Sequence, residues 1–129
     1  MQLKVVLFGV KTDNKKILVA DDDVLLRKLL NDLLTFYGYD VACVSNGKEA
    51  LARIETDSYD VLITDYMMPE MNGIELIKKA RYIKKSLAII GMSASEEEKG
   101  FLAAGANLFI AKPFSPYALK NIIEEICLT

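Results

Sequence analysis

Polar side chains stand at the ends of four apolar stretches of this sequence. Asp21 follows the stretch 17–20, Asp65 follows the run that begins at Val61, and Ser93 and Lys112 follow two later stretches. A carboxylate can attack phosphorus and form an acyl phosphate, provided that the incoming negative charge is offset. A magnesium ion and a lysine ammonium can offset that charge, and a hydroxyl can donate to a phosphoryl oxygen. These four positions therefore supply the groups needed for phosphoryl transfer onto Asp65.

The apolar stretches are typical of strands in one parallel sheet. Residues Val61 to Ile63 have the composition of a central strand that is buried on both faces. Strands and helices alternate along the chain, which predicts right-handed crossovers and helices on both faces of the sheet. Parallel strands bring their carboxyl ends to one edge, where ligands bind in open α/β sheets. The predicted strands cover 17–20, 39–44, 61–63, 87–92 and 108–111.

Apolar residues at helical spacing predict a helix after each strand. The helical spacing of the first helix runs to Tyr37, and Gly38 suits the left-handed residue that follows a helix end. The fourth helix begins with glutamates, whose charge is favourable at a helix N-terminus, and the last is capped by Ser115 and opened by Pro116. A turn is predicted at 46–47, the second helix over 49–55 and the fourth helix over 96–104. The third helix is predicted after Gly73. Its inward-facing residues are expected to be Leu76, Ile77, Ala80 and Ile83, and its outward-facing residues Lys78, Lys79 and Arg81.

Crowded carboxylates at one sheet edge would repel one another unless a cation joined them. Oxygen ligands without histidine or cysteine favour Mg²⁺, and Mn²⁺ or Ca²⁺ would also fit. Each residue also has a structural interpretation. Asp23 stands directly before a helix and is more readily an N-cap than a ligand. Asp65 and Ser93 taken singly are turn formers, and Lys112 alone is a solvated lysine. Their joint placement favours the functional interpretation.

The composition excludes several classes of site. The chain has 129 residues, enough for about one domain, and its net charge of −2 gives no whole-domain attraction to nucleic acid or to an anionic membrane. Histidine is absent, which excludes Ser-His-Asp and Cys-His catalysis, a histidine zinc site and a phosphohistidine carrier. Cys43 and Cys127 are expected to be free thiols. No run approaches the ~20 apolar residues of a membrane span, so we expect a soluble, cytoplasmic protein.

Residues 16–129 resemble the receiver domain of two-component response regulators. The motifs that carry the resemblance are Val-Ala-Asp-Asp-Asp at 19–23, Asp-Tyr-Met-Met-Pro-Glu-Met-Asn-Gly at 65–73, Ser-Ala at 93–94 and Lys-Pro-Phe at 112–114. The resemblance implies a flavodoxin-like, five-stranded parallel sheet with strand order 2-1-3-4-5. Residues 1–15 have no counterpart in a minimal receiver and are expected to form an N-terminal extension.

The resemblance also implies a role for each motif residue. Asp65 would receive a phosphoryl group from the phosphohistidine of a sensor histidine kinase or a histidine phosphotransfer protein. Asp21 and Asp22 would bind Mg²⁺ together with the backbone carbonyl of Met67. Lys112 would be the conserved-type lysine of the motif, preceding a cis peptide bond to Pro113.

The implied mechanism is a two-state switch. Ser93 takes the switch hydroxyl position, and Phe109 takes the switch aromatic position, which is often tyrosine. Phosphorylation adds charge and acceptor oxygens at Asp65, so Ser93 would move to bond one of them and Phe109 would turn inward. The altered surface of the last two helices and the fifth strand could then bind a downstream target protein or a second copy of the chain.

Three alternatives compete with this interpretation, which treats the chain as a signalling switch and not as an enzyme. An aspartyl-phosphate phosphatase of the haloacid dehalogenase kind wants a second aspartate two residues after the nucleophile, where this chain has Met67. A flavin- or nucleotide-binding protein would need a hydroxyl- or glycine-rich phosphate loop after the first strand, where this chain has three aspartates. A degenerate receiver acting only as a protein-binding module is the third alternative.

Overall fold

A computed structural model describes residues 15–128, in which five strands alternate strictly with five helices. The predicted extension over 1–15 lies outside the described residues except for Lys15. The elements are β1 (Lys16–Ala20), α1 (Val24–Phe36), β2 (Asp40–Val44), α2 (Gly47–Thr56), β3 (Val61–Asp65), α3 (Gly73–Ile83), β4 (Ala88–Ser93), α4 (Glu98–Ala104), β5 (Leu108–Ala111) and α5 (Pro116–Leu128).

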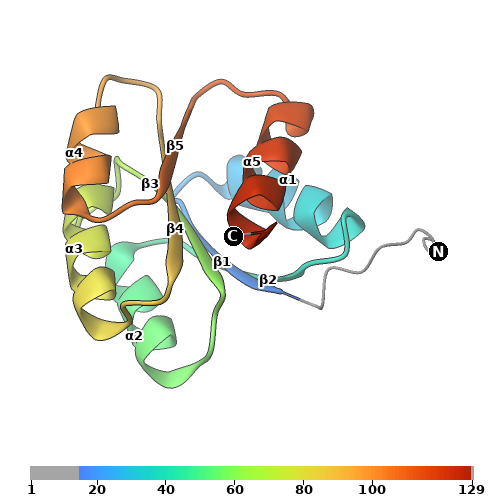
Figure 1. Ribbon diagram of the computed structural model, residues 1–129. Coiled ribbons are helices and arrows are strands. Elements are labelled where there is room, and N and C mark those ends of the chain that lie inside the picture. The colour runs from blue at the N-terminus through green and yellow to red at the C-terminus, as the bar shows by residue number, and fades with distance from the viewer. Residues whose placement is uncertain (1–14, 129) are drawn as a thin grey trace.

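The five strands form one parallel sheet in the order β2-β1-β3-β4-β5, which confirms the predicted flavodoxin-like fold. Helices α1 and α5 cover one face of the sheet, and α2, α3 and α4 cover the other (Figure 1). The loops that follow the strands gather at one edge, at the top of the view in Figure 1. The sheet therefore brings residues from distant parts of the sequence to this edge.

Two buried clusters hold the helices to the sheet, one on each face. The cluster under α2, α3 and α4 includes Leu62, Leu76 and Phe101, all fully buried. The cluster under α1 and α5 includes Ile63 and Leu119, also fully buried. Neighbouring residues of β3 thus point into opposite clusters, as expected for a central strand with both faces covered.

The residues predicted to cap or follow the ends of α1 and α5 do so in the structure. Asp23 caps α1 by accepting hydrogen bonds from the backbone of Leu25 at 3.0 Å and Leu26 at 3.3 Å. Ser115 caps α5 through a 3.0 Å bond from the Ala118 backbone, and Gly38 has a φ of 97°. The Lys112–Pro113 peptide bond is cis.

Four predictions about helix boundaries and faces are wrong. Helix α2 begins at Gly47 and not at 49, because Asn46 caps it by accepting from the Glu49 backbone at 2.8 Å. Helix α4 begins at Glu98 and not at 96, because Glu97, with φ −101° and ψ 10°, is the N-cap residue and lies just outside the helix. Ile83 in the last turn of α3 is 42% exposed. Arg81 is half-buried, because its guanidinium binds backbone carbonyls at the base of the fold, including that of Gly105.

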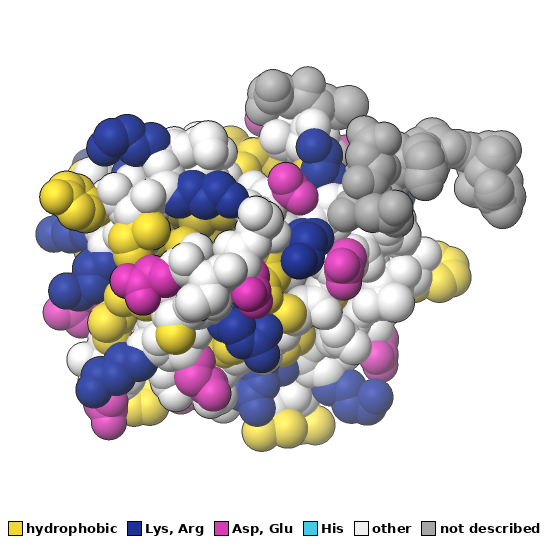
Figure 2. All heavy atoms as spheres, turned by 90° about the horizontal axis from the view of Figure 1, so that it is seen from below, with side chains coloured by type: hydrophobic (Ala, Val, Ile, Leu, Met, Phe, Trp, Pro, Cys, Tyr) yellow, Lys and Arg dark blue, Asp and Glu magenta, His cyan; other side chains and the backbone are white. Residues whose placement is uncertain are grey.

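The opposite end of the sheet from the strand carboxyl ends carries charges of both signs. Basic and acidic side chains are interspersed on this face, with hydrophobic groups between them (Figure 2). Cys43 and Cys127 are free and half-buried. Within residues 15–128, no helix is long and apolar enough to cross a membrane.

Candidate functional site

Strand register places two acids side by side at the loop edge of the sheet. Ala20, the last residue of β1, pairs with Thr64 of β3. Asp21 therefore leaves β1 beside Asp65, the last residue of β3. Both are close to inaccessible, with Asp21 fully buried and Asp65 7% exposed. The buried strands on either side hold these two carboxylates in fixed positions.

The packing of α3 keeps the end of β3 in place. The capping box of α3 joins Asn72 and Glu75, and the Gly73 backbone donates to the Tyr66 carbonyl at 2.9 Å. A Cβ atom on Gly73 would lie 2.2 Å from the backbone oxygen of Asp65. Only glycine allows the helix to start this close to the acid.

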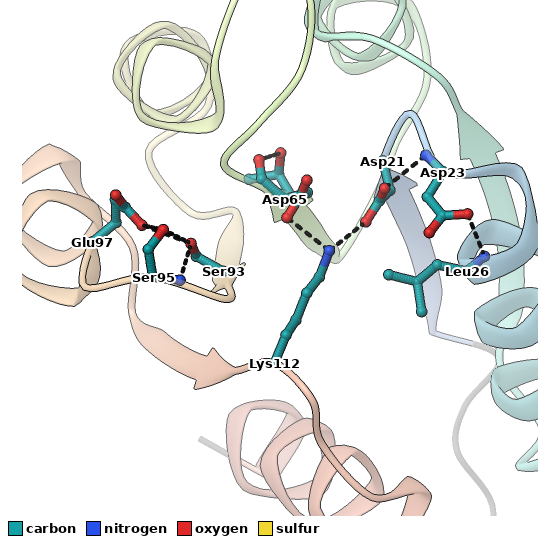
Figure 3. A network of polar contacts seen from close by, with 9 residues as sticks. Asp21, Asp23, Leu26, Asp65, Ser93, Ser95, Glu97 and Lys112 are labelled. Atoms are coloured by element: carbon teal, nitrogen blue, oxygen red, sulfur yellow. Dashed lines mark hydrogen bonds and ion pairs between the residues drawn. The ribbon is translucent and has the colours of Figure 1, made fainter.

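Lys112 reaches the two acids from the end of β5. Its ammonium Nζ lies 2.8 Å from Oδ1 of Asp65 and 3.2 Å from Oδ2 of Asp21 (Figure 3). Burial alone would lower the pKa of Lys112, but hydrogen bonds and charges from the two aspartates outweigh it and raise the pKa. Burial raises the pKa of Asp21, and the charge of Asp65 adds to the increase, while Lys112 and the backbone of Asp23 oppose it. Lys112 is therefore a fixed positive charge between two crowded acids.

A third acid completes a set of oxygen ligands. Carboxylate oxygens of Asp21, Asp22 and Asp65 all lie within 4.8 Å of one another. Asp22 is exposed and lines a groove of about 430 Å³ together with Met67 and other residues of the loop after β3. One ammonium does not neutralise three carboxylates, and their hard oxygens at this spacing suit a divalent cation such as Mg²⁺. The residues at this edge fit a magnesium site.

Ser93 lies at the same edge, but its hydroxyl faces away from the acids. The side chain is 2% exposed, and Oγ donates to Oε1 of Glu97 at 2.6 Å. The Ser95 backbone donates to the same Oγ at 3.1 Å. Figure 3 shows this group on one side of Asp65 and the contacts of Lys112 on the other. The structure thus brings Ser93 to the site without directing its hydroxyl at Asp65.

Glu97 was not among the residues that the sequence predicted at the site. Its hydrogen bonds from Ser93 and Ser95 lower its pKa. Three glutamates in a row, at 96–98, predict a helix start, so the sequence does not distinguish Glu97, whose side chain faces back into the loop. The signal that could have identified it is its spacing of four residues after the hydroxyl at the end of β4.

Phe109 lies on β5 and is half-buried. Its ring centroid is 5.6 Å from that of Phe101 in α4, which in turn makes an edge contact with Tyr66. Gly91 of β4 leaves room for Phe101, because a Cβ atom there would lie 2.5 Å from the ring. Phe109 therefore contacts the helix that follows the Ser93 loop.

Comparisons with known proteins agree with this arrangement. The sequence profile of the response regulator receiver domain matches residues 17–124. The alkaline phosphatase synthesis transcriptional regulatory protein PhoP of Bacillus subtilis is 42% identical over 116 residues, which cover 88% of this chain and 48% of PhoP, so the chain spans about half of that relative. The chemotaxis protein CheY homolog of Campylobacter jejuni is 41% identical over 119 residues, covering 86% of this chain and 91% of the homolog.

A solved structure gives the same result in three dimensions. The response regulator protein TrrA of Thermotoga maritima, in complex with Mg²⁺ and BeF, matches with a TM-score of 0.81 and 33% identity, covering 87% of this chain and 98% of that one. The family profile covers all five strands found here except Lys16, the first residue of β1, and reaches into α5. From sequence, fold and relatives together, this chain belongs to the response regulator receiver domain family of two-component signalling.

Proposed function

We propose that this chain is a phosphorylation-dependent switch that accepts a phosphoryl group on Asp65 from a phosphohistidine of a partner kinase or phosphotransfer protein. The observation that carries the proposal is the position of the Lys112 ammonium, 2.8 Å from Asp65 and 3.2 Å from Asp21. A cation at this place offsets the charge that arrives with a phosphoryl group. Residues 16–129 form the receiver in this proposal, and residues 1–15 an extension to it, in a cytoplasmic protein.

The transfer reaction uses the carboxylate of Asp65 as nucleophile. One of its oxygens forms a bond to phosphorus while the P–N bond of the phosphohistidine breaks. The electron pair of that bond leaves with the imidazole, which takes up a proton. The product is an acyl phosphate, and the Lys112 ammonium remains beside it as a counter-charge.

A divalent cation completes the charge balance of this reaction. Asp21, Asp22 and the backbone carbonyl of Met67 would hold Mg²⁺ beside Asp65, as their oxygen ligands suit. Bound Mg²⁺ supplies positive charge that offsets the phosphoryl oxygens. The TrrA structure, with Mg²⁺ and BeF bound, supports this choice of ion.

A protein as phosphoryl donor is supported by the surface beside Lys112. A groove of about 420 Å³ lies between α1 and the loop after β5, and Leu26, Leu29, Pro113 and Phe114 give it an apolar lining. Leu25, 78% exposed on the same turn of α1, adds apolar surface near the groove. Exposed apolar surface next to a reactive site favours a protein partner over a small charged donor.

Phosphorylation would then alter the surface formed by α4, β5 and α5. Ser93 leaves its present partners to bond a phosphoryl oxygen, and Phe109, whose ring already lies 5.6 Å from that of Phe101, turns further inward. A ligand shifts such an equilibrium only by binding one state better than the other, and the Ser93 contact supplies that difference. A downstream target or a second copy of the chain would bind the altered surface.

Two alternatives fit the site less well. The phosphatase reaction needs an acid two residues after the nucleophile, and Met67 stands there with its side chain 68% exposed. A receiver that serves only as a binding module would not need a lysine ammonium held between two buried carboxylates. In this proposal the chain is a signalling module that catalyses only its own phosphoryl transfer and slow dephosphorylation.

The test is incubation with acetyl phosphate and Mg²⁺, followed by intact-mass analysis. We expect a gain of one phosphoryl group, which is absent in Asp65→Asn and absent when a chelator replaces Mg²⁺. Asp40→Asn is the matched control, because it removes an exposed carboxylate at the opposite end of the strands, where Asp40 pairs with Lys16. Failure of the unaltered chain to gain mass, while another receiver reacts under the same conditions, would overturn the proposal.

A further inference from the structure

The hydroxyl of Ser93 is fully engaged on the side away from Asp65. It donates to Oε1 of Glu97 at 2.6 Å, and the hydroxyl of Ser95 donates to the same oxygen at 2.7 Å. Figure 3 shows these three side chains in a group, with the dashed lines running from Ser93 toward Glu97 and not toward Asp65. A single carboxylate oxygen therefore binds two hydroxyls of the loop after β4.

Glu97 holds this position at the expense of its own helix. It is the N-cap residue of α4, yet its side chain makes no capping hydrogen bond. The N-cap residues Asp23, Asn46 and Asn72 all accept bonds from the backbones of their own helices. An N-cap side chain ordinarily satisfies one of the free N–H groups of the first turn. The carboxylate of Glu97 instead turns back to the strand end.

The two acceptors available to Ser93 compete for one proton. A serine hydroxyl has a single O–H donor, so Ser93 can donate to Glu97 or to a phosphoryl oxygen, but not to both. Ionised acceptors form the stronger hydrogen bonds. The lowered pKa of Glu97, caused by the bonds from Ser93 and Ser95, keeps its carboxylate ionised at neutral pH. Breaking the Ser93–Glu97 bond therefore opposes the move that the switch requires.

We propose that Glu97 is a positioning residue that holds the Ser93 hydroxyl away from Asp65 in the unphosphorylated chain, and so weakens binding of a phosphoryl group at Asp65. The inference rests on the proposed function, because it takes Ser93 as the donor to that group. If only a small fraction of the molecules have the Ser93 hydroxyl free to face Asp65, the apparent dissociation constant for a phosphoryl group is the intrinsic constant divided by that fraction. Loss of Glu97 releases this restraint. It also frees the N-cap position of α4, so the same bond links the site to the helix that carries Phe101.

The test measures the affinity for beryllofluoride, a phosphoryl analogue, in the presence of Mg²⁺ by isothermal titration calorimetry. We expect Glu97→Ala to lower the dissociation constant about three- to tenfold, the size of one net hydrogen bond. Glu97→Gln keeps an acceptor oxygen without the charge, so its constant should fall between those of Glu97→Ala and the unaltered chain. Glu96→Ala is the matched control, because it removes the same charge from an exposed side chain of the same loop and should change nothing.

A double-mutant cycle separates positioning from a general effect on the loop. In a Ser93→Ala background, Glu97→Ala should have no effect, since the hydroxyl through which Glu97 acts is gone. Unchanged or weaker binding in both Glu97 variants, or an equal gain without Ser93, would overturn the inference while leaving the phosphoacceptor role of Asp65 intact. If the unaltered chain does not bind beryllofluoride, the proposed function fails and this inference fails with it.

Discussion

Asp65 lies between two groups of polar side chains that differ in how completely they are assembled. On one side, Lys112 already contacts Asp65 and Asp21 at hydrogen-bond distance. On the other side, Ser93 is buried like Asp21 and Asp65, but it donates to Glu97. The first group comes from strand ends held by the sheet, and the second includes the loop before α4. A site with one preformed side and one side held back can gain a new contact on phosphorylation.

The largest effect should come from the preformed side. Replacing Lys112 by glutamine removes the only ammonium that the described residues place beside Asp65. We expect acetyl phosphate to phosphorylate Lys112→Gln about 100- to 1,000-fold more slowly, the range found when one preorganised donor is removed from a charged site. Time-resolved intact-mass analysis measures the rate. Lys99→Gln, on the exposed surface of α4, should react normally. Equal rates for the two variants would contradict the role of Lys112.

A steric change beneath Asp65 should also damage the preformed side. A Cβ atom on Gly73 would lie 2.2 Å from the Asp65 carbonyl oxygen, so Gly73→Ala must push α3 and the end of β3 apart. We expect a loss of about 1–3 kcal/mol in the free energy of unfolding, as for other overpacked sites. Urea unfolding gives the value. Ala103→Gly, on the exposed surface of α4, serves as a contrast. A Gly73→Ala protein as stable as the unaltered chain would show that the contact between residue 73 and the Asp65 carbonyl oxygen is not tight.

The side that is held back should contribute less to the rate. Ser93→Ala removes the one hydroxyl that, in the proposed switch, reaches the phosphoryl group only after leaving Glu97. We therefore expect acetyl phosphate to react with Ser93→Ala on the order of tenfold more slowly, well short of the Lys112→Gln effect. The same mass assay applies. If Ser93→Ala were the slower of the two variants, the contrast between the sides would be reversed.

Magnesium should stabilise the acids of the preformed side. At ten times its dissociation constant, Mg²⁺ raises the free energy of unfolding by about 1.4 kcal/mol if it binds only the folded chain. Thermal unfolding with and without Mg²⁺ should show this increase for the unaltered chain and little or none for Asp22→Asn, because that variant removes the one exposed carboxylate of the cluster. Equal stabilisation of both proteins would place the ion elsewhere.

The smallest effect concerns pH in the absence of metal. Burial raises the pKa of Asp21 above its value in the unfolded chain. The protonated carboxyl of Asp21 therefore adds to the free energy of unfolding below about pH 4. This contribution is lost as the pH rises through the pKa of Asp21 in the folded chain. In chelator, Asp21→Asn should therefore gain stability at neutral pH, and the gain should shrink toward about pH 4. Urea unfolding across this range measures it, and a gain independent of pH would rule out this cause.

The sequence predicted the preformed side better than the other. Parallel topology alone brings Asp21, Asp65 and Lys112 to one edge, because each follows a strand whose neighbours are set by the fold. The placement of Glu97 could not be predicted this way. A glutamate at this place in the sequence fits the first turn of a helix equally well. Whether its side chain instead turns back to the loop depends on the hydrogen bonds that the Ser93 and Ser95 hydroxyls offer it. The exposure of Ile83, the last residue of α3, could not be predicted either, because helical spacing gives the direction of a side chain and not how much of the helix is covered.

The most direct test of the switch is a crystal structure of the unaltered chain with Mg²⁺ and beryllofluoride. The predicted result is beryllofluoride attached to a carboxylate oxygen of Asp65, with Lys112 still in place and the Ser93 hydroxyl moved from Glu97 to a fluoride. Beryllofluoride bound away from Asp65 would contradict the phosphoacceptor assignment. Beryllofluoride on Asp65 with Ser93 still donating to Glu97 would contradict the switch.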